Sequence, residues 1–215
     1  MTIKQFVFNA FSENTYVVYD DTKECIIIDP GCYESSEKAE LKKFIVDNNL
    51  TVTSLINTHC HIDHVLGNNF VKNEYGVGLT IHKLDIETLK ANDVVASVYG
   101  FQAYEASEAD FFIDESEQVK FGNSYFNILF VPGHAKGHIA LVNEHEKICI
   151  GGDVLFQQSI GRTDLPGGDF DTLMDSIKNK FFKLPDDVTV YCGHGPSTNI
   201  GYEKQNNPFC GVVSN

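Results

Sequence analysis

Residues 58–67 read Thr-His-Cys-His-Ile-Asp-His-Val-Leu-Gly, which places three histidines and one aspartate within six positions. Imidazole and carboxylate groups are the ligands that suit zinc, iron or manganese. Side chains so close along the chain point in different directions and cannot all bind one ion in good geometry. The stretch therefore predicts two metal ions, or one ion whose ligands are supported by neighbouring groups, and it requires further ligands from later segments.

The residues on either side place this stretch on a loop between a strand and a helix. Residues 54–57 before it form a short apolar run that is typical of a buried strand. Residues 65–71 after it resemble the start of a helix. A loop in this position leaves the backbone able to turn several side chains toward one point.

Three later residues share one setting and are candidates for the missing ligands. Each follows a predicted strand and has a glycine beside it: His134, Asp153 and His194. Glycine permits sharp turns and close backbone approach, which a loop converging on a metal needs. The other histidines lack this setting, apart from His138, which follows Gly137 and stays open. We interpret His82 and His145 as structural or exposed.

The remaining pattern alternates strands and helices and predicts layered α/β architecture. Asp29 ends an apolar strand, where it is either a turn residue or an outer partner of the metal site. No linker or low-complexity run interrupts the chain, so we expect one domain over residues 1–215. Strands are expected at 3–9, 15–19, 25–28, 77–81, 118–121, 126–130, 139–142, 148–150 and 188–191. Helices are expected after a cap at Ser35 or Ser36, at 86–89, and after a cap at Asp169, the last with an apolar face reaching Phe181 and Pro185 as its stop.

Two features of the chain allow more than one interpretation. Residues 93–114 mix aromatic, glycine and acidic residues, which favours a surface excursion or a lid that walls the substrate. The six cysteines contain no Cys-x-x-Cys pair, so we expect thiols in a reducing compartment. Cys60 and Cys192 lie near candidate ligands, and we expect both to be small buried apolar residues.

Composition and charge exclude several classes of function. The chain of 215 residues has a net charge of -14, which disfavours nucleic acid because phosphate binding depends on Lys and Arg. No apolar run is long enough to span a membrane, and residues 1–5 do not begin a signal peptide. We therefore expect a cytoplasmic protein, a monomer or small homo-oligomer, that acts on a small molecule.

The motifs together resemble the metallo-β-lactamase superfamily. The resemblance covers essentially the whole chain, and its motifs occur in the superfamily's order. It implies an α/β fold of the αββα sandwich type, with two mixed β-sheets flanked by helices and a site for two divalent metal ions, zinc or alternatively iron or manganese. The first ion would be bound by His59, His61 and His134. The second would be bound by Asp63, His64 and His194, and Asp153 would bridge the two.

Within the superfamily the chain most resembles short single-domain bacterial members of the type II glyoxalase branch. Residues 161–164, Gly-Arg-Thr-Asp, residues 194–198, His-Gly-Pro-Ser-Thr, and residues 207–209 carry this resemblance. It implies hydrolysis of a thioester such as S-lactoylglutathione by a metal-activated hydroxide. Asp63 would orient that nucleophile or pass its proton, and Arg162 and Thr163 would bind the substrate. Arg162 is the single arginine of the chain.

Two departures keep alternatives open. Full-length type II glyoxalases add a helical domain that holds glutathione, and the present sequence lacks that region. Asp164 stands where an aromatic contact is usual. The Gly-Arg-Thr-Asp run also resembles glutathione persulfide dioxygenases, which use one iron. The remaining alternative is a metal-binding protein without catalysis. No Gly-x-Ser-x-Gly elbow is present, which argues against a serine nucleophile.

Overall fold

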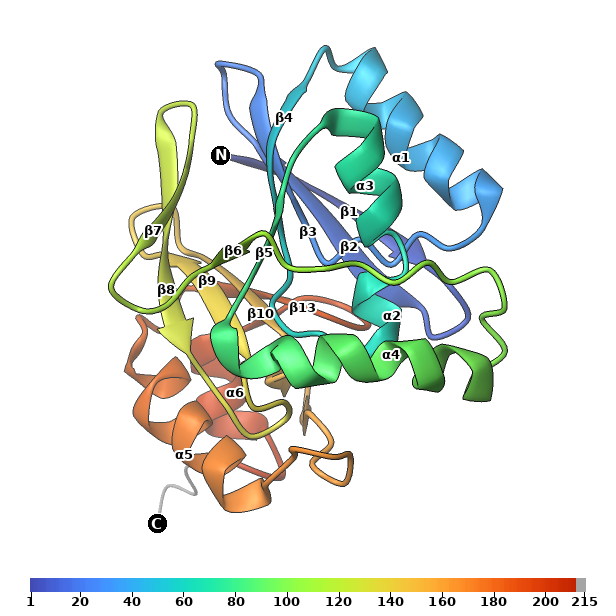
Figure 1. Ribbon diagram of the computed structural model, residues 1–215. Helices are drawn as coiled ribbons and strands as arrows, with labels where there is room; N and C mark the ends of the chain where they lie inside the picture. Colours follow the sequence, from blue (N-terminus) through green and yellow to red (C-terminus); the bar gives the residue numbers. More distant parts are fainter. Residues whose placement is uncertain (212–215) are drawn as a thin grey trace. The chain divides into compact units, whose positions relative to one another are not determined.

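Two compact units, each with its own hydrophobic core, make up the computed structural model, which describes residues 1–211 (Figure 1). The first unit comprises residues 1–113 with 120–125, and the second comprises residues 114–119 and those from 126 onward. The structure contains two six-stranded mixed sheets and flanking helices. The fold class expected from the sequence is therefore confirmed, whereas the expectation of a single domain stays a prediction.

The first sheet has the strand order β1-β2-β3-β4-β5-β6. Its first three strands are antiparallel neighbours, and β3 to β6 run parallel. Parallel strands need crossover connections, which the helices supply. The strands are β1 (Thr2–Phe8), β2 (Glu13–Tyr19), β3 (Glu24–Ile28), β4 (Thr51–Ile56), β5 (Leu79–Ile81) and β6 (Phe111–Phe112). The crossovers contain α1 (Ser35–Asp47), α2 (Ile62–Val65), α3 (Asn68–Tyr75), the 3-10 helix η1 (Lys83–Asp85) and α4 (Ile86–Val98).

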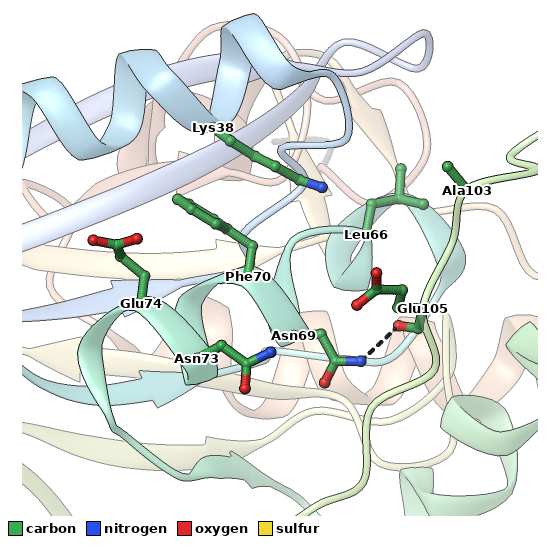
Figure 2. A pocket seen from close by; sticks show the side chains of 8 residues that line it. All are labelled: Lys38, Leu66, Asn69, Phe70, Asn73, Glu74, Ala103 and Glu105. Atoms are coloured by element: carbon green, nitrogen blue, oxygen red, sulfur yellow. Dashed lines mark hydrogen bonds between the residues drawn. The ribbon is translucent and has the colours of Figure 1, made fainter.

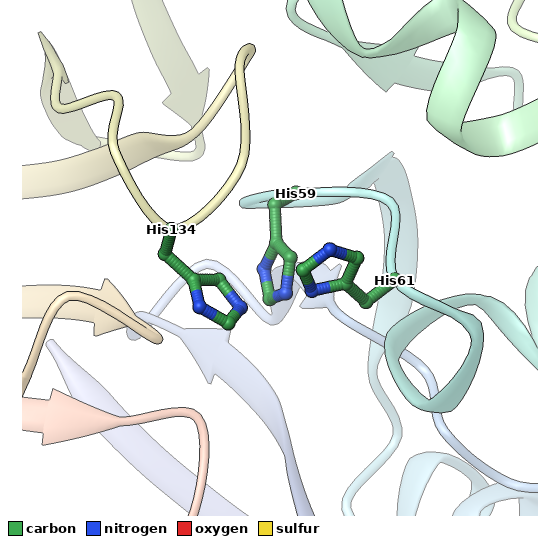
Figure 3. A group of neighbouring side chains, drawn as sticks. All are labelled: His59, His61 and His134. Carbon is green, nitrogen blue, oxygen red and sulfur yellow. The ribbon is translucent and has the colours of Figure 1, made fainter. Parts of the chain in front are cut away.

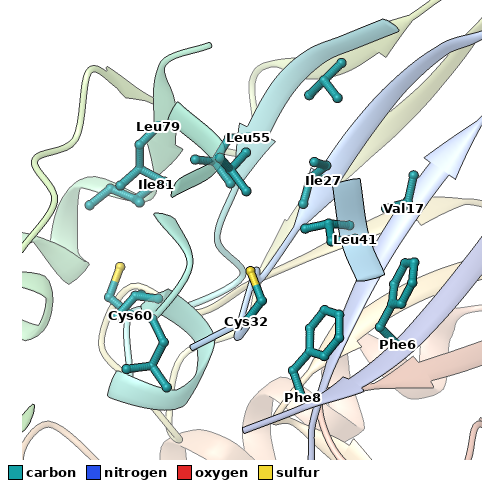
Figure 4. Packing of buried hydrophobic residues seen from close by; sticks show 14 of the residues in the cluster. Phe6, Phe8, Val17, Ile27, Cys32, Leu41, Leu55, Cys60, Leu79 and Ile81 are labelled. Carbon is teal, nitrogen blue, oxygen red and sulfur yellow. The ribbon is translucent and has the colours of Figure 1, made fainter. Parts of the chain in front are cut away.

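One face of this sheet forms the core of the first unit. Val17, Ile27 and Leu55 pack in the same cluster as Leu41 of α1 (Figure 4). Full burial of such a side chain contributes about 1.5–3 kcal/mol. Residues of the opposite face, including Ile26, are also fully buried. Burial on both faces explains why β3 is a continuous apolar run rather than an alternating one.

The second sheet has the order β14-β13-β10-β9-β8-β7, with β10 and β13 parallel. Its strands are β7 (Gln118–Phe121), β8 (Ser124–Phe130), β9 (Ile139–Asn143), β10 (Ile148–Gly152), β13 (Thr189–Cys192) and β14 (Thr198–Asn199). The tip of the β7–β8 hairpin belongs to the first unit. A small sheet of β11 (Leu155–Phe156) and β12 (Ser159–Ile160) follows β10. The helices are α5 (Phe170–Asn179), the 3-10 helix η2 (Phe181–Lys183) and α6 (Ile200–Asn206).

The core of the second unit joins α5 to this sheet. Leu173 and Ile177 of α5 pack in one cluster with Val142 and Val190 of the strands. The predicted cap of α5 is confirmed, because the Asp169 side chain accepts a hydrogen bond from the backbone N–H of Thr172. This bond satisfies one of the backbone donors left open at a helix start.

Several predicted boundaries are wrong. The α1 helix is capped at Glu34 rather than at a serine, and Glu37 accepts the backbone N–H of Glu34. The α4 helix runs to Val98, far beyond the predicted end at residue 89. Its polar and β-branched residues lower helix propensity, and packing of its buried face overrides that preference. The α5 helix ends at Asn179, before the expected limit, and the sequence did not predict β11, β12, β14 or α6.

The chain after α4 is bound to the surface of the first unit. Asn69 of α3 donates hydrogen bonds to the carbonyl oxygens of Glu105 and Ala106, and Lys72 donates to that of Glu108. These contacts suit the expected surface excursion, and the lid stays a prediction.

No helix among residues 1–211 has both the length and the apolar character that crossing a membrane would require. Within the same residues all six cysteines are buried and none forms a disulfide.

Candidate metal centre

Two metal-ligand candidates of the first unit, His59 and His61, lie on the loop between β4 and α2, as predicted, whereas Asp63 and His64 lie within α2 itself, because the helix begins three residues earlier than expected. His59 and His61 face each other on this loop, with ring centroids 4.7 Å apart (Figure 3). The ring of His64 lies 4.1 Å from that of His59, and both residues are almost fully buried. The His64 Nε2 atom lies 3.6 Å from Asp63 Oδ2. The first unit thus brings four predicted ligands together: His59, His61, Asp63 and His64.

Asp29 contacts this loop from the end of β3. Its Oδ1 accepts the backbone N–H of Thr58 at 2.7 Å, and its Oδ2 accepts the Thr58 hydroxyl at 2.6 Å. The same Oδ2 lies 3.2 Å from Nδ1 of His64. An imidazole whose Nδ1 donates to a carboxylate presents Nε2 to a metal. This is the geometry that the predicted orienting role of Asp29 requires, and the role itself stays a prediction.

Asp29 adopts a backbone conformation that is uncommon outside glycine. Its φ is 49°, in the left-handed region that aspartate tolerates better than most residues. The donor atoms of Asp29, His59 and His64 lie within 4.8 Å of one another. Because both Asp29 oxygens already accept hydrogen bonds, we interpret it as a partner of the ligands and not as a ligand.

A second buried carboxyl group, which the sequence did not reveal, lies beside His64. Glu13 in β2 is fully buried, and its Oε1 lies 3.9 Å from His64 Nδ1. Burial raises the pKa of Glu13 well above its ordinary value, which favours the neutral acid. Its Oε2 pairs with the Thr15 hydroxyl at 2.9 Å. Nothing in its strand context distinguishes Glu13 from a surface residue.

The ligand candidates of the second unit lie at the ends of β8, β10 and β13. Because β9 is antiparallel to both β8 and β10, and β13 is parallel to β10, these three strands end at the same edge of the sheet. The structure accordingly brings His134, Asp153 and His194 together. Asp153 Oδ2 lies 3.5 Å from Nε2 of His134 and 3.5 Å from Nε2 of His194. One carboxylate oxygen between two imidazoles is the arrangement expected of a shared ligand.

Backbone groups orient these side chains. His134 Nδ1 lies 2.7 Å from the carbonyl oxygen of Arg162, so Nδ1 donates and Nε2 is left to bind a metal. Gly161 permits this approach, because a Cβ there would lie 1.9 Å from the carbonyl oxygen of Asp153. His138 is buried, and its Nε2 accepts the backbone N–H of Asp153 at 3.0 Å. The sequence left His138 open, and only the preceding glycine hinted at this contact.

The predicted substrate residues lie on the loop after β12. The guanidinium of Arg162 binds both carboxylate oxygens of Asp164, at 2.7 and 2.8 Å. This hydrogen bonding lowers the pKa of Asp164 to about 2. Both side chains are largely exposed, and Thr163 between them is half-buried. The substrate roles of Arg162 and Thr163 stay predictions.

Each unit has a surface pocket. A pocket of about 280 Å³ opens beside His194 and is lined by Phe156, Gln157, Ser159, Gly195 and Pro196. A pocket of about 320 Å³ in the first unit lies between α1, α3 and residues 103–105 (Figure 2). No candidate ligand lines this pocket of the first unit. Of these two pockets, the one beside His194 borders a candidate ligand.

The donor set fits divalent metal ions. Imidazoles and carboxylates collect near strand ends in each unit. Nδ1 of His64 contacts Asp29 and Nδ1 of His134 contacts the carbonyl oxygen of Arg162, so the Nε2 atom of each ring lies toward a carboxylate, that of Asp63 and that of Asp153 respectively. The thiols do not compete, because burial raises the pKa of Cys60 well above its ordinary value and holds it protonated. His145 is exposed and His82 caps η1, as predicted. The fold and these clusters define a metal-binding α/β protein.

The chain belongs to the metallo-beta-lactamase superfamily, whose family model matches residues 9–194. It is 37% identical over 211 residues to the hydroxyacylglutathione hydrolase GloC of Haemophilus influenzae, covering 97% of this chain and 98% of that protein. Membership of this superfamily, together with the similarity to the GloC hydrolase, supports a metal-dependent hydrolase.

Two solved structures have the same fold over nearly their full lengths. The BLEG-1 B3 metallo-beta-lactamase matches with a TM-score of 0.89 and 33% identity, covering 97% of this chain and 99% of its own. TTHA1623 in a di-iron-bound form matches with a TM-score of 0.85 and 30% identity, covering 96% and 99%.

The contacts of Asp29 lead to a test of its orienting role. In Asp29→Asn the side chain loses acceptor capacity toward Thr58 and His64, while asparagine still tolerates the left-handed backbone. We expect a folded protein whose zinc affinity falls about 10–100-fold. Competition with a chromophoric chelator measures this affinity, with the exposed Asp47→Asn as the matched control. Unchanged affinity in Asp29→Asn would contradict the role.

Proposed function

We propose that this protein hydrolyses thioesters of the hydroxyacylglutathione type with the help of two divalent metal ions. The observation that carries the proposal is the position of Asp153 Oδ2, 3.5 Å from the Nε2 atoms of both His134 and His194. Similarity to the GloC enzyme supports the choice of substrate. The proposal requires the two units to act as a single domain over residues 1–215.

The proposed ligand sets follow from the donor clusters and the family. One ion would be held by His59, His61 and His134, and the other by Asp63, His64 and His194. Asp153 would be shared by both ions, and its negative charge would offset the repulsion between two cations. Zinc suits these nitrogen and oxygen donors, and iron or manganese are the alternatives, iron being the metal named for TTHA1623.

The chemistry divides between the ions and the side chains. Two divalent ions in such a site lower the pKa of water toward neutrality and polarise the acyl carbonyl. Asp63 would orient the attacking water and take up its proton; its carboxylate is partly exposed and lies 3.6 Å from His64 Nε2. The departing thiol has an ordinary pKa of about 8.5, so it leaves as a thiolate without a strong general acid.

Two regions of the second unit suit the substrate. The pocket of about 280 Å³ beside His194 is lined by neutral side chains and suits the uncharged acyl group. Arg162 offers a planar fork of donors that matches a carboxylate, and Thr163 lies next to it. In the structure the Asp164 carboxylate binds the Arg162 guanidinium, so a substrate carboxylate would have to displace Asp164.

A second candidate function is the oxidation of glutathione persulfide with one iron. The observation that favours it is the Gly-Arg-Thr-Asp run at residues 161–164, which resembles persulfide dioxygenases. That reaction needs molecular oxygen and one metal per chain, whereas the proposed hydrolysis needs neither oxygen nor a redox-active metal. Metal content and the oxygen requirement therefore separate the two functions.

The central test combines metal analysis with a substrate panel. We expect nearly two metal ions per chain in protein from metal-replete cells, and turnover of S-lactoylglutathione without oxygen. A β-lactam is the comparison substrate, because the similar BLEG-1 protein is a metallo-beta-lactamase. The second candidate would take the place of the proposal if the protein held one firmly bound iron per chain and consumed glutathione persulfide only in the presence of oxygen.

Asp153 gives a sharper test of the two-metal site. Asp153→Asn removes the charge that offsets the repulsion between the ions, so we expect metal content to fall from about two to one or fewer and turnover to fall with it. Elemental analysis and thioester kinetics on the same preparation measure both, with the exposed Asp187→Asn as control. Full metal content together with full turnover in Asp153→Asn would exclude the bridging role.

Arg162 allows a test of the substrate carboxylate. Arg162→Ala should raise KM for an anionic thioester and spare kcat and metal content, because binding lost equally in ground and transition states changes KM alone. The expected loss is about 1.5–3 kcal/mol, the range for a hydrogen bond to a charged group. Asp164→Ala is a control in the opposite direction. It frees the Arg162 guanidinium from its ion pair and should therefore lower the KM for the anionic thioester. Equal KM values in wild type and Arg162→Ala would leave Arg162 with only its pairing to Asp164.

A further inference from the structure

Two buried polar residues lie at the start of α4 and on its buried face. Asp85 is the last residue of η1 and the N-cap of α4, and it is 0% exposed. Asn92 is 2% exposed and shares the buried face of α4 with Leu89 and Ala96. Polar side chains in a buried position are costly unless they are hydrogen-bonded, so their partners indicate what they do.

Both side chains bind the backbone of one residue, Cys60. Asp85 Oδ2 accepts the Cys60 N–H at 2.6 Å, and Asn92 Nδ2 donates to the Cys60 carbonyl oxygen at 2.9 Å. Cys60 belongs to neither a helix nor a strand. The N-cap residue of α4 and one residue within α4 therefore give the backbone of Cys60 the hydrogen bonds that a helix or strand would otherwise provide.

The position of Cys60 makes this contact relevant to the metal centre. Cys60 separates His59 from His61, whose rings lie 4.7 Å apart and nearly perpendicular, at 88°. The orientation of the two peptide groups around Cys60 sets the direction in which each histidine leaves the backbone. Asp85 is also the N-cap of α4, a position where the helix dipole favours a carboxylate.

We propose that Asp85 and Asn92 are positioning residues that clamp Cys60 and so hold His59 and His61 at the angle needed to bind a metal together. This inference rests on the metal centre of the proposed function. It adds residues 85–92 to the two segments of the first unit already assigned to the site, namely residues 59–64 and Asp29. Neither residue contacts the reacting atoms, so their effect should appear first in metal binding.

The test measures metal affinity and ligand geometry instead of turnover. Asp85→Ala and Asn92→Leu should each weaken zinc binding to the folded protein about 10–100-fold, the usual effect of removing an outer partner of a metal ligand. The d–d absorption bands of cobalt(II)-substituted protein should shift in both variants. Asp85→Asn should retain most of the affinity, because an amide oxygen still accepts the Cys60 N–H.

Leu89→Ala is the matched control, because it lies on the same buried face and has an apolar side chain. It should lower the melting temperature and leave the zinc affinity of the folded protein within about twofold of wild type. Zinc affinity and cobalt spectra equal to wild type in Asn92→Leu would overturn the clamp, as would a loss in Leu89→Ala as large as in the clamp variants. If Asp85→Ala does not fold, Asn92→Leu and Asp85→Asn carry the test. Wild-type protein that binds neither metal would overturn the metal centre as well, whereas absence of thioester turnover alone would overturn only the proposed substrate.

Discussion

The hydrogen bonds of the buried Asp29 carboxylate are the interaction on which the arrangement of the first unit's ligand candidates depends. A carboxylate removed from water is costly unless it is paired, and Asp29 is paired with two groups of Thr58 and with His64. The parallel pairing of β3 and β4 makes this possible, because it places the ends of both strands at one edge of the sheet. Strand pairing thus brings a residue at the end of β3 within hydrogen-bonding distance of the loop after β4.

The same loop is held from further directions. Asn57 donates a hydrogen bond to the carbonyl oxygen of His64, and Asn9 donates one to that of Asp63. With Asp85 and Asn92 on Cys60, the loop has buried side-chain partners along most of its length. A loop held in this way loses its conformational entropy when the protein folds and not when an ion binds. The metal site is therefore preorganised.

The second unit positions its ligands by another route. Its three candidates follow strands that end at one edge, and the partners that orient His134 and Asp153 are a backbone carbonyl and the ring of His138. A Cβ at Gly161 would lie 1.9 Å from the carbonyl oxygen of Asp153 and 3.1 Å from His134 Nδ1. Of the glycines beside the candidates, Gly133 packs closely against the backbone of Leu173, whereas Gly195 has open space around it.

The sequence by itself determined the metal-binding chemistry, most strands and the fold class, because ligand spacing and apolar patterns are local properties of the chain. Tertiary structure alone decided which buried polar groups support the ligands. The groups bound to Thr58 and Cys60 lie 25 to 32 residues away along the chain, and no spacing rule connects them. Glu13, Asp85 and His138 were missed or left open for this reason. The structure also showed Asp29 in contact with Thr58 and His64, and Arg162 paired with Asp164. Contacts between distant segments form only when packing brings those segments together, so the sequence could name ligand candidates but not their partners.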